Sequence, residues 1–311
     1  MRLLFVGTPE VALPALEAFV ASQHEVIGVL TRPEARSGRG RRRHPSAVAV
    51  RGDALGLPVL TPERPGDPAF VEQLRELAPD CCPVVAYGAL LPQSVLDIPR
   101  HGWVNLHFSV LPAWRGAAPV QRAILAGDEV TGATAFRIVK ELDAGPALGT
   151  LTESIRPSDT AGELLERLAI AGAPLLVDTI DHLEIGDIDE RPQPDDGVSY
   201  APKIEIDDAR IRWIEPAFAV DRRIRACTPA PGAWTTLDGT RLKIGPVRML
   251  PDATDLAPGE LDADRRQVRV GTGTHAVALG EIQPPGKQAM DATAWGRGAR
   301  LDGRVRLGAD D

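Results

Sequence analysis

The strongest structural signal in the sequence is WVNLHFSVLPAWRGAAP, at residues 103–119. Its beginning, Trp103–His107, predicts a buried strand. Asn105, His107 and Ser109 stand two residues apart, and a period of two sends the side chains of a strand to one face. An amide, an imidazole and a hydroxyl at the exit of a strand can polarise a carbonyl group and move a proton. The combination is typical of an acyl-transfer site, although a lone histidine at a strand end is more often structural.

Strands and helices alternate through the preceding and following sequence. Further strands are predicted at residues 2–6, 25–31, 58–60, 83–86, 134–139 and 147–154. Helices are predicted at 68–77, after an N-cap at Ser46, and from an N-cap at Ser158 or Asp159 to about His182. This alternation predicts an α/β fold whose mostly parallel sheet is covered on both faces. The segments Gly7-Thr8-Pro9, Tyr87-Gly88 and Asn105–Ser109 follow three of the strands. We expect them to converge on one crevice at the carboxyl edge of the sheet.

The composition changes near Gly186 and divides the chain. Residues 186–205 begin with a stretch rich in acidic residues and proline, which predicts a solvated linker. A helix is predicted at Glu215–Cys227, and the short apolar runs after it lie between turns rich in Gly, Pro and Asp. That pattern predicts a small β-barrel. We therefore expect a catalytic domain at residues 1–185, a linker at 186–205 and a second domain at 206–311.

The overall composition favours a globular protein of the reducing cytoplasm. Of 311 residues, 43% are hydrophobic and 25% charged, which excludes a disordered or fibrous chain. No apolar run is as long as a membrane span. The three cysteines, Cys81, Cys82 and Cys227, have no metal-ligand spacing and do not suggest a disulfide scaffold. The net charge of -8 speaks against a general affinity for nucleic acid.

The charge is unevenly distributed, however. The segment Arg32–Pro45 is predicted to be a long loop that follows a strand on the ligand-binding edge, and six arginines and one glutamate lie between Arg32 and Arg43. A run of like charges is usually a solvated loop. Long loops inside compact domains are often functional, and arginine pairs well with phosphate. The candidate phosphate-binding residues are Arg36, Arg39, Arg41, Arg42 and Arg43.

A second candidate catalytic group, Asp143, lies in the sequence KELDAG between two predicted strands. It could belong to an ordinary Asp-x-Gly turn, or it could be a carboxylate that orients the imidazole. Spacing alone leaves both open. The sequence contains no G-x-G-x-x-G, P-loop, G-x-S-x-G or H-E-x-x-H motif, which disfavours a nicotinamide dehydrogenase and the common nucleotide, serine and zinc hydrolases.

These segments together resemble the methionyl-tRNA formyltransferases, within the 10-formyltetrahydrofolate-dependent formyltransferase family. Asn-x-His with Ser-x-Leu-Pro and a later Leu-Asp-x-Gly mark the wider family, and the basic loop and the C-terminal segments are more specific to the tRNA enzymes. The matching segments are FVGTPEVALPAL (5–16), TRPEARSGRGRRRHPSAVAV (31–50), CCPVVAYGALLP (81–92), NLHFSVLPAWRGAAPVQRA (105–123), LDAGPAL (142–148), YAPKIEIDDARIRW (200–213) and IRACTPAPGAW (224–234).

The resemblance implies a Rossmann-like, doubly wound N-terminal domain and a C-terminal OB-like β-barrel. It implies transfer of the formyl group of 10-formyltetrahydrofolate, a co-substrate, to the α-amino group of methionyl-initiator tRNA during translation initiation. It implies catalytic roles for Asn105, His107 and Asp143 and contact of the arginine loop with the tRNA. We expect no metal, no membrane association and a monomer. The folate-binding residues that the resemblance implies are Ser109, Val110, Leu111, Pro112, Tyr87, Gly88 and Leu90.

Two departures and two alternatives accompany this resemblance. Val110 stands where the family usually has leucine, and the C-terminal third is less basic than is common in the family. One alternative is a formyltransferase that acts on glycinamide ribonucleotide or an amino sugar, but neither substrate explains the arginine loop. The other is an RNA-binding protein without catalysis, which the presence of Asn105, His107 and Asp143 disfavours.

Overall fold

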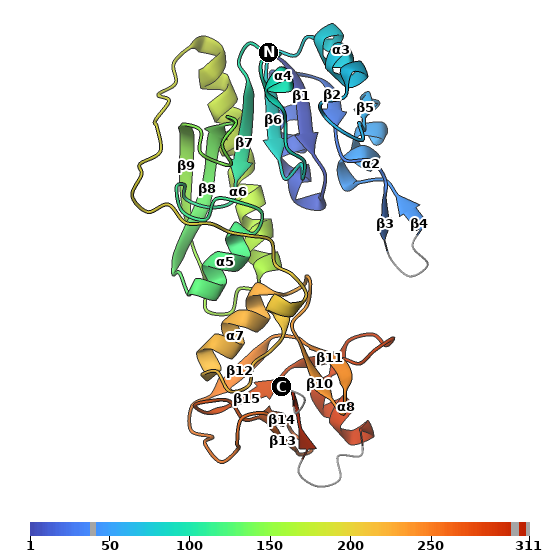
Figure 1. Ribbon diagram of the computed structural model, residues 1–311, viewed down its shortest axis with the longest axis vertical. Helices are drawn as coiled ribbons and strands as arrows, with labels where there is room; N and C mark the ends of the chain where they lie inside the picture. The colour runs from blue at the N-terminus through green and yellow to red at the C-terminus, as the bar shows by residue number, and fades with distance from the viewer. Residues whose placement is uncertain (38–41, 300–304, 309–311) are drawn as a thin grey trace. The chain divides into compact units, whose positions relative to one another are not determined.

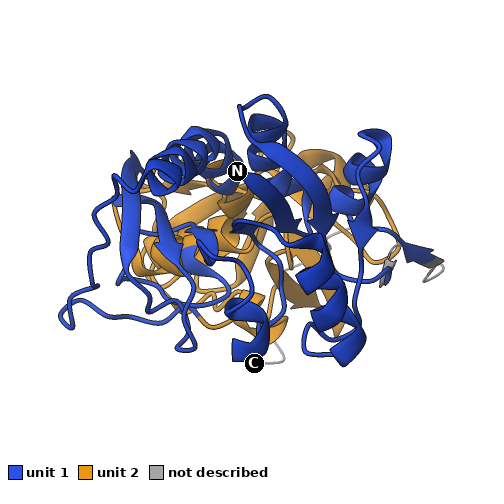
Figure 2. Cartoon of the chain, turned by 90° about the horizontal axis from the view of Figure 1, so that it is seen from above, with its two compact units in different colours: residues 1–119, 130–154, 165–201 blue, residues 120–129, 155–164, 202–311 orange. Residues whose placement is uncertain are grey.

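The computed structural model describes residues 1–37, 42–299 and 305–308 (Figure 1). The chain forms two compact units (Figure 2). The first contains residues 1–119, 130–154 and 165–201, and the second contains residues 120–129, 155–164 and 202–311. Residues 186–201, expected to form a solvated linker, therefore make their contacts with the first unit as far as Ala201.

The first unit is built on a seven-stranded sheet of order β5-β2-β1-β6-β7-β8-β9 within the described residues. The first five of these strands are parallel, while β8 and β9 form an antiparallel edge. Predicted and observed strands agree closely, except that β8 begins four residues before the expected Thr134. The strands are β1 (Arg2–Gly7), β2 (Glu25–Leu30), β5 (Val59–Leu60), β6 (Cys82–Val85), β7 (Trp103–His107), β8 (Val130–Arg137) and β9 (Ala147–Ser154).

Helices cover both faces of this sheet, because the strands carry apolar side chains on both faces. On one face, Gly172 of α6 packs against Leu106 of β7, and the ring of Phe19 in α1 lies 6.3 Å from that of Phe5. On the other face, Trp103 of β7 donates its indole N–H to the Val95 carbonyl in α4. The α/β, doubly wound fold class is confirmed. The helices are α1 (Leu13–Val20), α2 (Ala47–Ala54), α3 (Pro68–Leu77), α4 (Gln93–Leu96) and α6 (Ala161–Ile185), with a short 3₁₀ turn η1 (Glu10–Ala12).

Two helix caps were predicted from the sequence, and one of them is wrong. Ser46 caps α2 by accepting a hydrogen bond from the Ala49 N–H at 3.0 Å, as expected. Helix α6 is capped by Thr160 and not by Ser158 or Asp159. Thr160 and Glu163 exchange hydrogen bonds between side chain and backbone, which is a capping box.

The segment Arg32–Pro45, predicted to be a loop, contains a small hairpin. Strands β3 (Ala35–Ser37) and β4 (Arg42–His44) pair antiparallel, with Arg36 opposite Arg43. The sequence gives no apolar alternation here, so backbone pairing had no pattern by which to be recognised. At the base of the segment, the hydroxyls of Thr31 and Ser46 lie 2.6 Å apart and share a hydrogen bond. Residues 38–41 lie outside the described residues.

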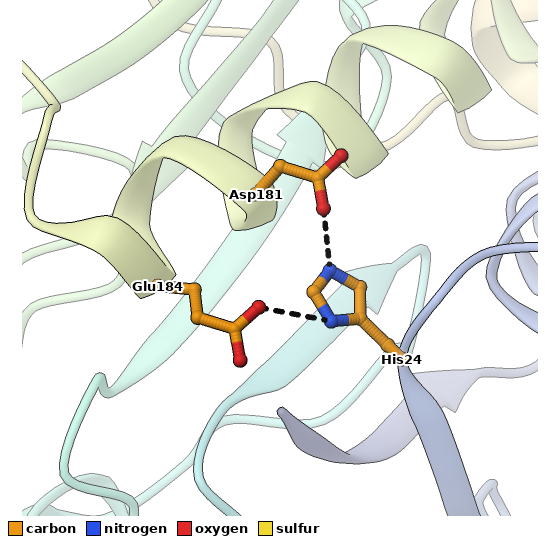
Figure 3. A group of neighbouring side chains, drawn as sticks. All are labelled: His24, Asp181 and Glu184. Carbon is orange, nitrogen blue, oxygen red and sulfur yellow. Dashed lines mark ion pairs between the residues drawn. The ribbon is translucent and has the colours of Figure 1, made fainter.

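The last turns of α6 are held by a buried histidine from the turn before β2 (Figure 3). His24 Nε2 lies 3.1 Å from Asp181 Oδ1, and His24 Nδ1 lies 3.6 Å from Glu184 Oε2. Burial holds the pKa of His24 below its usual value, and the Met1 ammonium adds to this, whereas the two carboxylates act in the opposite direction. Because each ring nitrogen faces a different carboxylate, His24 ties α6 to the sheet.

The second unit contains two antiparallel sheets, of order β10-β11-β16-β17 and β12-β15-β14-β13-β18 among the described residues. The predicted helix at Glu215–Cys227 is present as the slightly shorter α7. The elements are α5 (Pro119–Ala126), η2 (Asp207–Ala209), α7 (Ala217–Ala226), β10 (Trp234–Leu237), β11 (Thr240–Ile244), β12 (Val247–Leu250), β13 (Glu260–Ala263), β14 (Val268–Val270), β15 (Ala276–Leu279), β16 (Glu281–Gln283), β17 (Met290–Asp291), α8 (Ala292–Gly298) and β18 (Val305–Arg306). No helix in the described part of the chain is both long and apolar enough to span a membrane.

Candidate active site

Strand β7 presents Asn105 and His107 on one face of the sheet and Leu106 on the other, where it meets α6. In the antiparallel pairing with β8, Asn105 lies opposite Phe136 and His107 lies opposite Thr134. The Cα atoms of Asn105 and His107 are thus about 7 Å apart along the strand. The amide and the imidazole share one face at the carboxyl end of a buried strand, as the alternation predicts.

The alternation does not extend to Ser109, because β7 ends at His107. Ser109 is fully buried and donates its hydroxyl to the Ala113 carbonyl at 2.6 Å. Its own carbonyl accepts from the Thr134 hydroxyl at 2.8 Å, and Thr134 Oγ1 accepts in turn from the Leu111 N–H at 3.1 Å. The expectation that the strand alternation continues to Ser109 is therefore wrong. The hydroxyl fixes the turn that follows the strand.

The protonation of His107 is set by its surroundings. The ring is buried, and its edge faces Phe136 with the ring centroids 6.3 Å apart. Nε2 lies 2.9 Å from the Trp114 carbonyl, and because a carbonyl only accepts, Nε2 carries the hydrogen. Burial lowers the pKa of His107, against the raising effects of Asp143 and of this hydrogen bond. The neutral ring therefore keeps its free electron pair on Nδ1.

Asp143 lies beside that free nitrogen. Its Oδ2 is 3.8 Å from His107 Nδ1, and the same oxygen accepts the Gly116 N–H at 2.8 Å. Asp143 belongs to the connection between β8 and β9 and has a φ of 48°, a left-handed conformation that is uncommon for a non-glycine residue. A Cβ on the nearby Gly145 would lie 1.8 Å from the Arg137 carbonyl, so the turn passes very close to the end of β8. The Asp-x-Gly turn and the carboxylate beside the imidazole are both present.

The other residues expected to bind folate lie around the same strand ends. Strands β1, β6 and β7 are neighbours in the sheet, and the Thr8 hydroxyl donates to the Tyr87 carbonyl at 2.7 Å, so these exits converge as expected. The Tyr87 hydroxyl is buried and has no hydrogen-bond partner among the described residues, whereas Leu90 is 83% exposed. Gly88 is also exposed, Leu111 is buried, and Val110 and Pro112 are partly buried.

Only part of the arginine set can be placed. Arg36 and Arg42 belong to strands β3 and β4, and Arg43 is exposed. Arg39 and Arg41 lie outside the described residues. Because the hairpin follows β2, which runs parallel to β1, it leaves the sheet at the same carboxyl edge as the end of β7.

Sequence reasoning missed several groups of this site. Trp114 and Gly116 contribute a backbone carbonyl and a backbone N–H, which no side-chain pattern reveals. Thr134 was assigned to a strand, but its position opposite His107 follows only from strand pairing. Gln193 bridges Arg115 and the Asp143 turn from a segment expected to be a solvated linker.

Comparison with known proteins covers both halves of the chain. Residues 1–180 match the family model described as formyl transferase, and residues 203–300 match that of the formyl transferase C-terminal domain. The chain belongs to the formyl transferase family.

This formyl transferase is similar to two curated relatives over nearly its whole length. It is 63% identical over 310 residues to the methionyl-tRNA formyltransferase of Nocardioides sp. (strain ATCC BAA-499 / JS614), covering 99% of this chain and 98% of that protein. It is 64% identical over 310 residues to the methionyl-tRNA formyltransferase of Thermobifida fusca (strain YX), with both chains covered to 100%.

A solved structure shares the fold of this formyl transferase at low identity. HypX from Aquifex aeolicus, in complex with tetrahydrofolic acid, matches with a TM-score of 0.68 and 20% sequence identity. The match covers 97% of this chain but only 48% of HypX. The likeness concerns the fold alone.

Proposed function

We propose that this chain transfers the formyl group of 10-formyltetrahydrofolate to the α-amino group of methionyl-initiator tRNA, giving N-formylmethionyl-tRNA for translation initiation. The observation that carries the proposal is the approach of Asp143 Oδ2 to within 3.8 Å of His107 Nδ1, on a chain 63% identical over its length to a methionyl-tRNA formyltransferase. A carboxylate beside the free nitrogen of a neutral imidazole suits the removal of a proton from an attacking amine.

The proposed reaction uses Asn105, His107 and Asp143 without a covalent enzyme intermediate. The neutral amine attacks the formyl carbon, and the Asn105 amide donates a hydrogen bond to the oxyanion that forms. His107 Nδ1 accepts the proton that the amine loses, and Asp143 stabilises the resulting imidazolium. When the bond from the formyl carbon to the folate nitrogen breaks, the imidazolium returns its proton to that nitrogen. These side chains handle both the charge and the proton, so the scheme requires no metal ion.

The folate is proposed to lie along Ser109–Pro112, with Tyr87, Gly88 and Leu90 near its ring. Two observations support this placement. Leu90 is a large apolar side chain left 83% exposed at the strand exits. The buried Tyr87 hydroxyl has no partner among the described residues, and a buried polar atom without a partner calls for an explanation such as a ligand.

The initiator tRNA is proposed to contact Arg36, Arg39, Arg41, Arg42 and Arg43. The support is the concentration of arginines in the sequence of this segment, whose described strands β3 and β4 follow β2 at the carboxyl edge of the sheet. Arginine binds phosphate through paired hydrogen bonds. An RNA backbone offers a row of such phosphates.

We also propose the domain bounds, the cellular location and the oligomeric state. Residues 1–185 would form the catalytic domain, 186–205 the linker and 206–311 an OB-like tRNA-binding domain, although residues 186–201 make their contacts with the first unit. We place the protein in the cytoplasm, because all three cysteines are free and thiols remain reduced there. We expect it to act as a monomer.

A single assay tests the function. The purified chain is mixed with 10-formyltetrahydrofolate and methionyl-initiator tRNA, and both tetrahydrofolate release and the formylmethionyl ester are measured. Uncharged tRNA and glycinamide ribonucleotide or an amino-sugar nucleotide serve as control acceptors. If tetrahydrofolate is released only with a control acceptor, that acceptor is the substrate in place of methionyl-initiator tRNA. If none is released with any acceptor, the protein does not transfer formyl groups.

A further inference from the structure

Gln193 stands apart from the other residues of its segment. Its neighbours Arg191, Pro192, Pro194 and Asp195 are exposed, whereas Gln193 is partly buried. The acidic and proline-rich composition of this stretch predicted a solvated linker. In the structure, both the oxygen and the nitrogen of the Gln193 carboxamide form hydrogen bonds.

The carboxamide of Gln193 makes four hydrogen bonds. Its oxygen accepts from Arg115 Nε at 3.1 Å and from Arg115 Nη2 at 2.7 Å. Its nitrogen donates to the carbonyls of Asp143 and Gly145, both at 2.8 Å. A guanidinium only donates and a carbonyl only accepts, so the orientation of the amide is fixed by its partners. All four residues lie in the first compact unit.

These bonds join the two segments that meet at His107. Arg115 precedes Gly116, whose N–H holds Asp143 Oδ2 at 2.8 Å, and the Asp143 and Gly145 carbonyls belong to the turn that carries the carboxylate. The left-handed conformation of Asp143 is uncommon for a residue with a Cβ. Surrounding contacts must therefore maintain it, and Gln193 supplies a contact to the carbonyl of that same residue.

We propose that Gln193 is a positioning residue that holds the Asp143 carboxylate beside His107. The proposal rests on the proposed function for its catalytic meaning, because Gln193 acts only through Asp143. Through Gln193, the predicted linker at residues 186–205 contributes to the active site. A merely structural role, in which Gln193 only anchors the segment, predicts different results for the variants below.

Two variants separate the contacts of Gln193. In Gln193→Glu the side chain still accepts from Arg115 but cannot donate to the two carbonyls. In Gln193→Leu both sets of bonds are lost without any added charge. Asp195→Asn is the matched control, since it changes one charge at an exposed position of the same segment. Thermal unfolding of each variant establishes that it is folded, and Gln193→Glu remains informative if Gln193→Leu is not.

The kinetic readout is the separation of kcat from KM. A small displacement of a catalytic group can lower the rate by about 10- to 100-fold. We expect a loss of that size in kcat for both Gln193 variants, with KM for both substrates within about twofold of the wild type. The Asp195→Asn variant should keep wild-type kcat.

The second readout is the titration of His107, followed by NMR of its ring protons. The Asp143 carboxylate raises the pKa of His107, so displacement of Asp143 lowers this pKa. We expect both Gln193 variants to shift it downward, in the same direction as Asp143→Asn. The added carboxylate of Gln193→Glu by itself raises this pKa, so an upward shift confined to that variant, with no shift in Gln193→Leu, would overturn the positioning role.

The two proposals fail in different ways. If Asp143→Asn abolishes turnover while folded Gln193 variants keep kcat and the wild-type His107 titration, the positioning role is overturned and the proposed function stands. If the wild-type protein transfers no formyl group, the proposed function fails. The His107 titration then still decides whether Gln193 positions Asp143.

Discussion

Oδ2 of Asp143 lies 3.8 Å from Nδ1 of His107. This distance is longer than a hydrogen bond, but the carboxylate is close enough to favour protonation of the ring. Apo geometry of this kind often tightens when substrate is bound. The arrangement leaves Nδ1 available to a proton from the substrate while a negative charge stands beside it.

Each of the three catalytic side chains should be needed for turnover. Removal of one oxyanion donor typically lowers the rate by about a hundredfold or more. We expect Asn105→Ala, His107→Ala and Asp143→Ala each to lower kcat by at least this factor while tRNA affinity is retained, because none of the three is proposed to hold the tRNA. Single-turnover formylation and filter binding measure the two quantities. Near-normal turnover in Asn105→Ala or His107→Ala would remove the scheme.

The pH dependence of catalysis follows from the lowered pKa of His107. An ordinary histidine titrates near pH 6.5, so neutral His107 persists below that pH. We expect kcat/KM, calculated for the neutral form of the substrate amine, to change little from about pH 7.5 to about pH 6.5 and to fall only at lower pH, where the ring becomes protonated. In Asp143→Asn the acidic limb should move to still lower pH, because the carboxylate that raises the pKa is gone. Movement toward higher pH would contradict the proposed pairing.

The arginines of the segment Arg32–Pro45 should affect tRNA binding and its salt dependence, and not the chemical step. Each phosphate contact adds about 0.7–0.9 to the slope of log affinity against log salt concentration. Replacing Arg39, Arg41 and Arg42 with alanine should flatten this slope and weaken tRNA binding, with little change in kcat at saturating tRNA. Arg64→Ala, an exposed arginine elsewhere in the first unit, is the control. An unchanged slope in the triple variant would make the hairpin an ordinary solvated loop.

The buried His24 should make stability depend on pH. Its folded pKa is lower than its unfolded one, so the unfolded state binds more protons between the two values and the free energy of unfolding rises with pH there. The stability is thus fully present above about pH 6.5 and declines as the pH falls toward the folded pKa. His24→Gln should reduce this slope in urea titrations between about pH 7.5 and pH 5.5. A slope that is unchanged in the variant would assign the dependence to other groups.

The Asp143 turn should tolerate no side chain at Gly145. A Cβ there would lie 1.8 Å from the Arg137 carbonyl, so Gly145→Ala forces the backbone to move. We expect a loss of about 3 kcal/mol or more in unfolding free energy, together with lower kcat. Gly298→Ala in α8 is the control, since nothing lies within 4 Å of its Cβ position. Equal stability of the two variants would show that the turn can relax.

Some elements were predictable because their patterns are local. Strands β7 and β9 and helix α3 have the predicted bounds, since α3 has an amphipathic pattern and the two strands begin directly after Gly102 and Pro146. The hairpin at residues 35–44 and the Thr160 cap of α6 were not predicted, because backbone pairing and a choice among adjacent polar residues leave little trace in composition.

By itself, the sequence determined the α/β alternation, the shared face of Asn105 and His107 and the turn that contains Asp143, because these depend on period and on residue chemistry. Only the tertiary structure decided that Asp143 lies beside His107, that the Trp114 carbonyl fixes the imidazole tautomer, and that Gln193 links the Arg115 and Asp143 segments. The physical reason is that these relations involve backbone atoms and residues distant in the chain. Only the folded sheet and its connecting turns bring them within reach of one another.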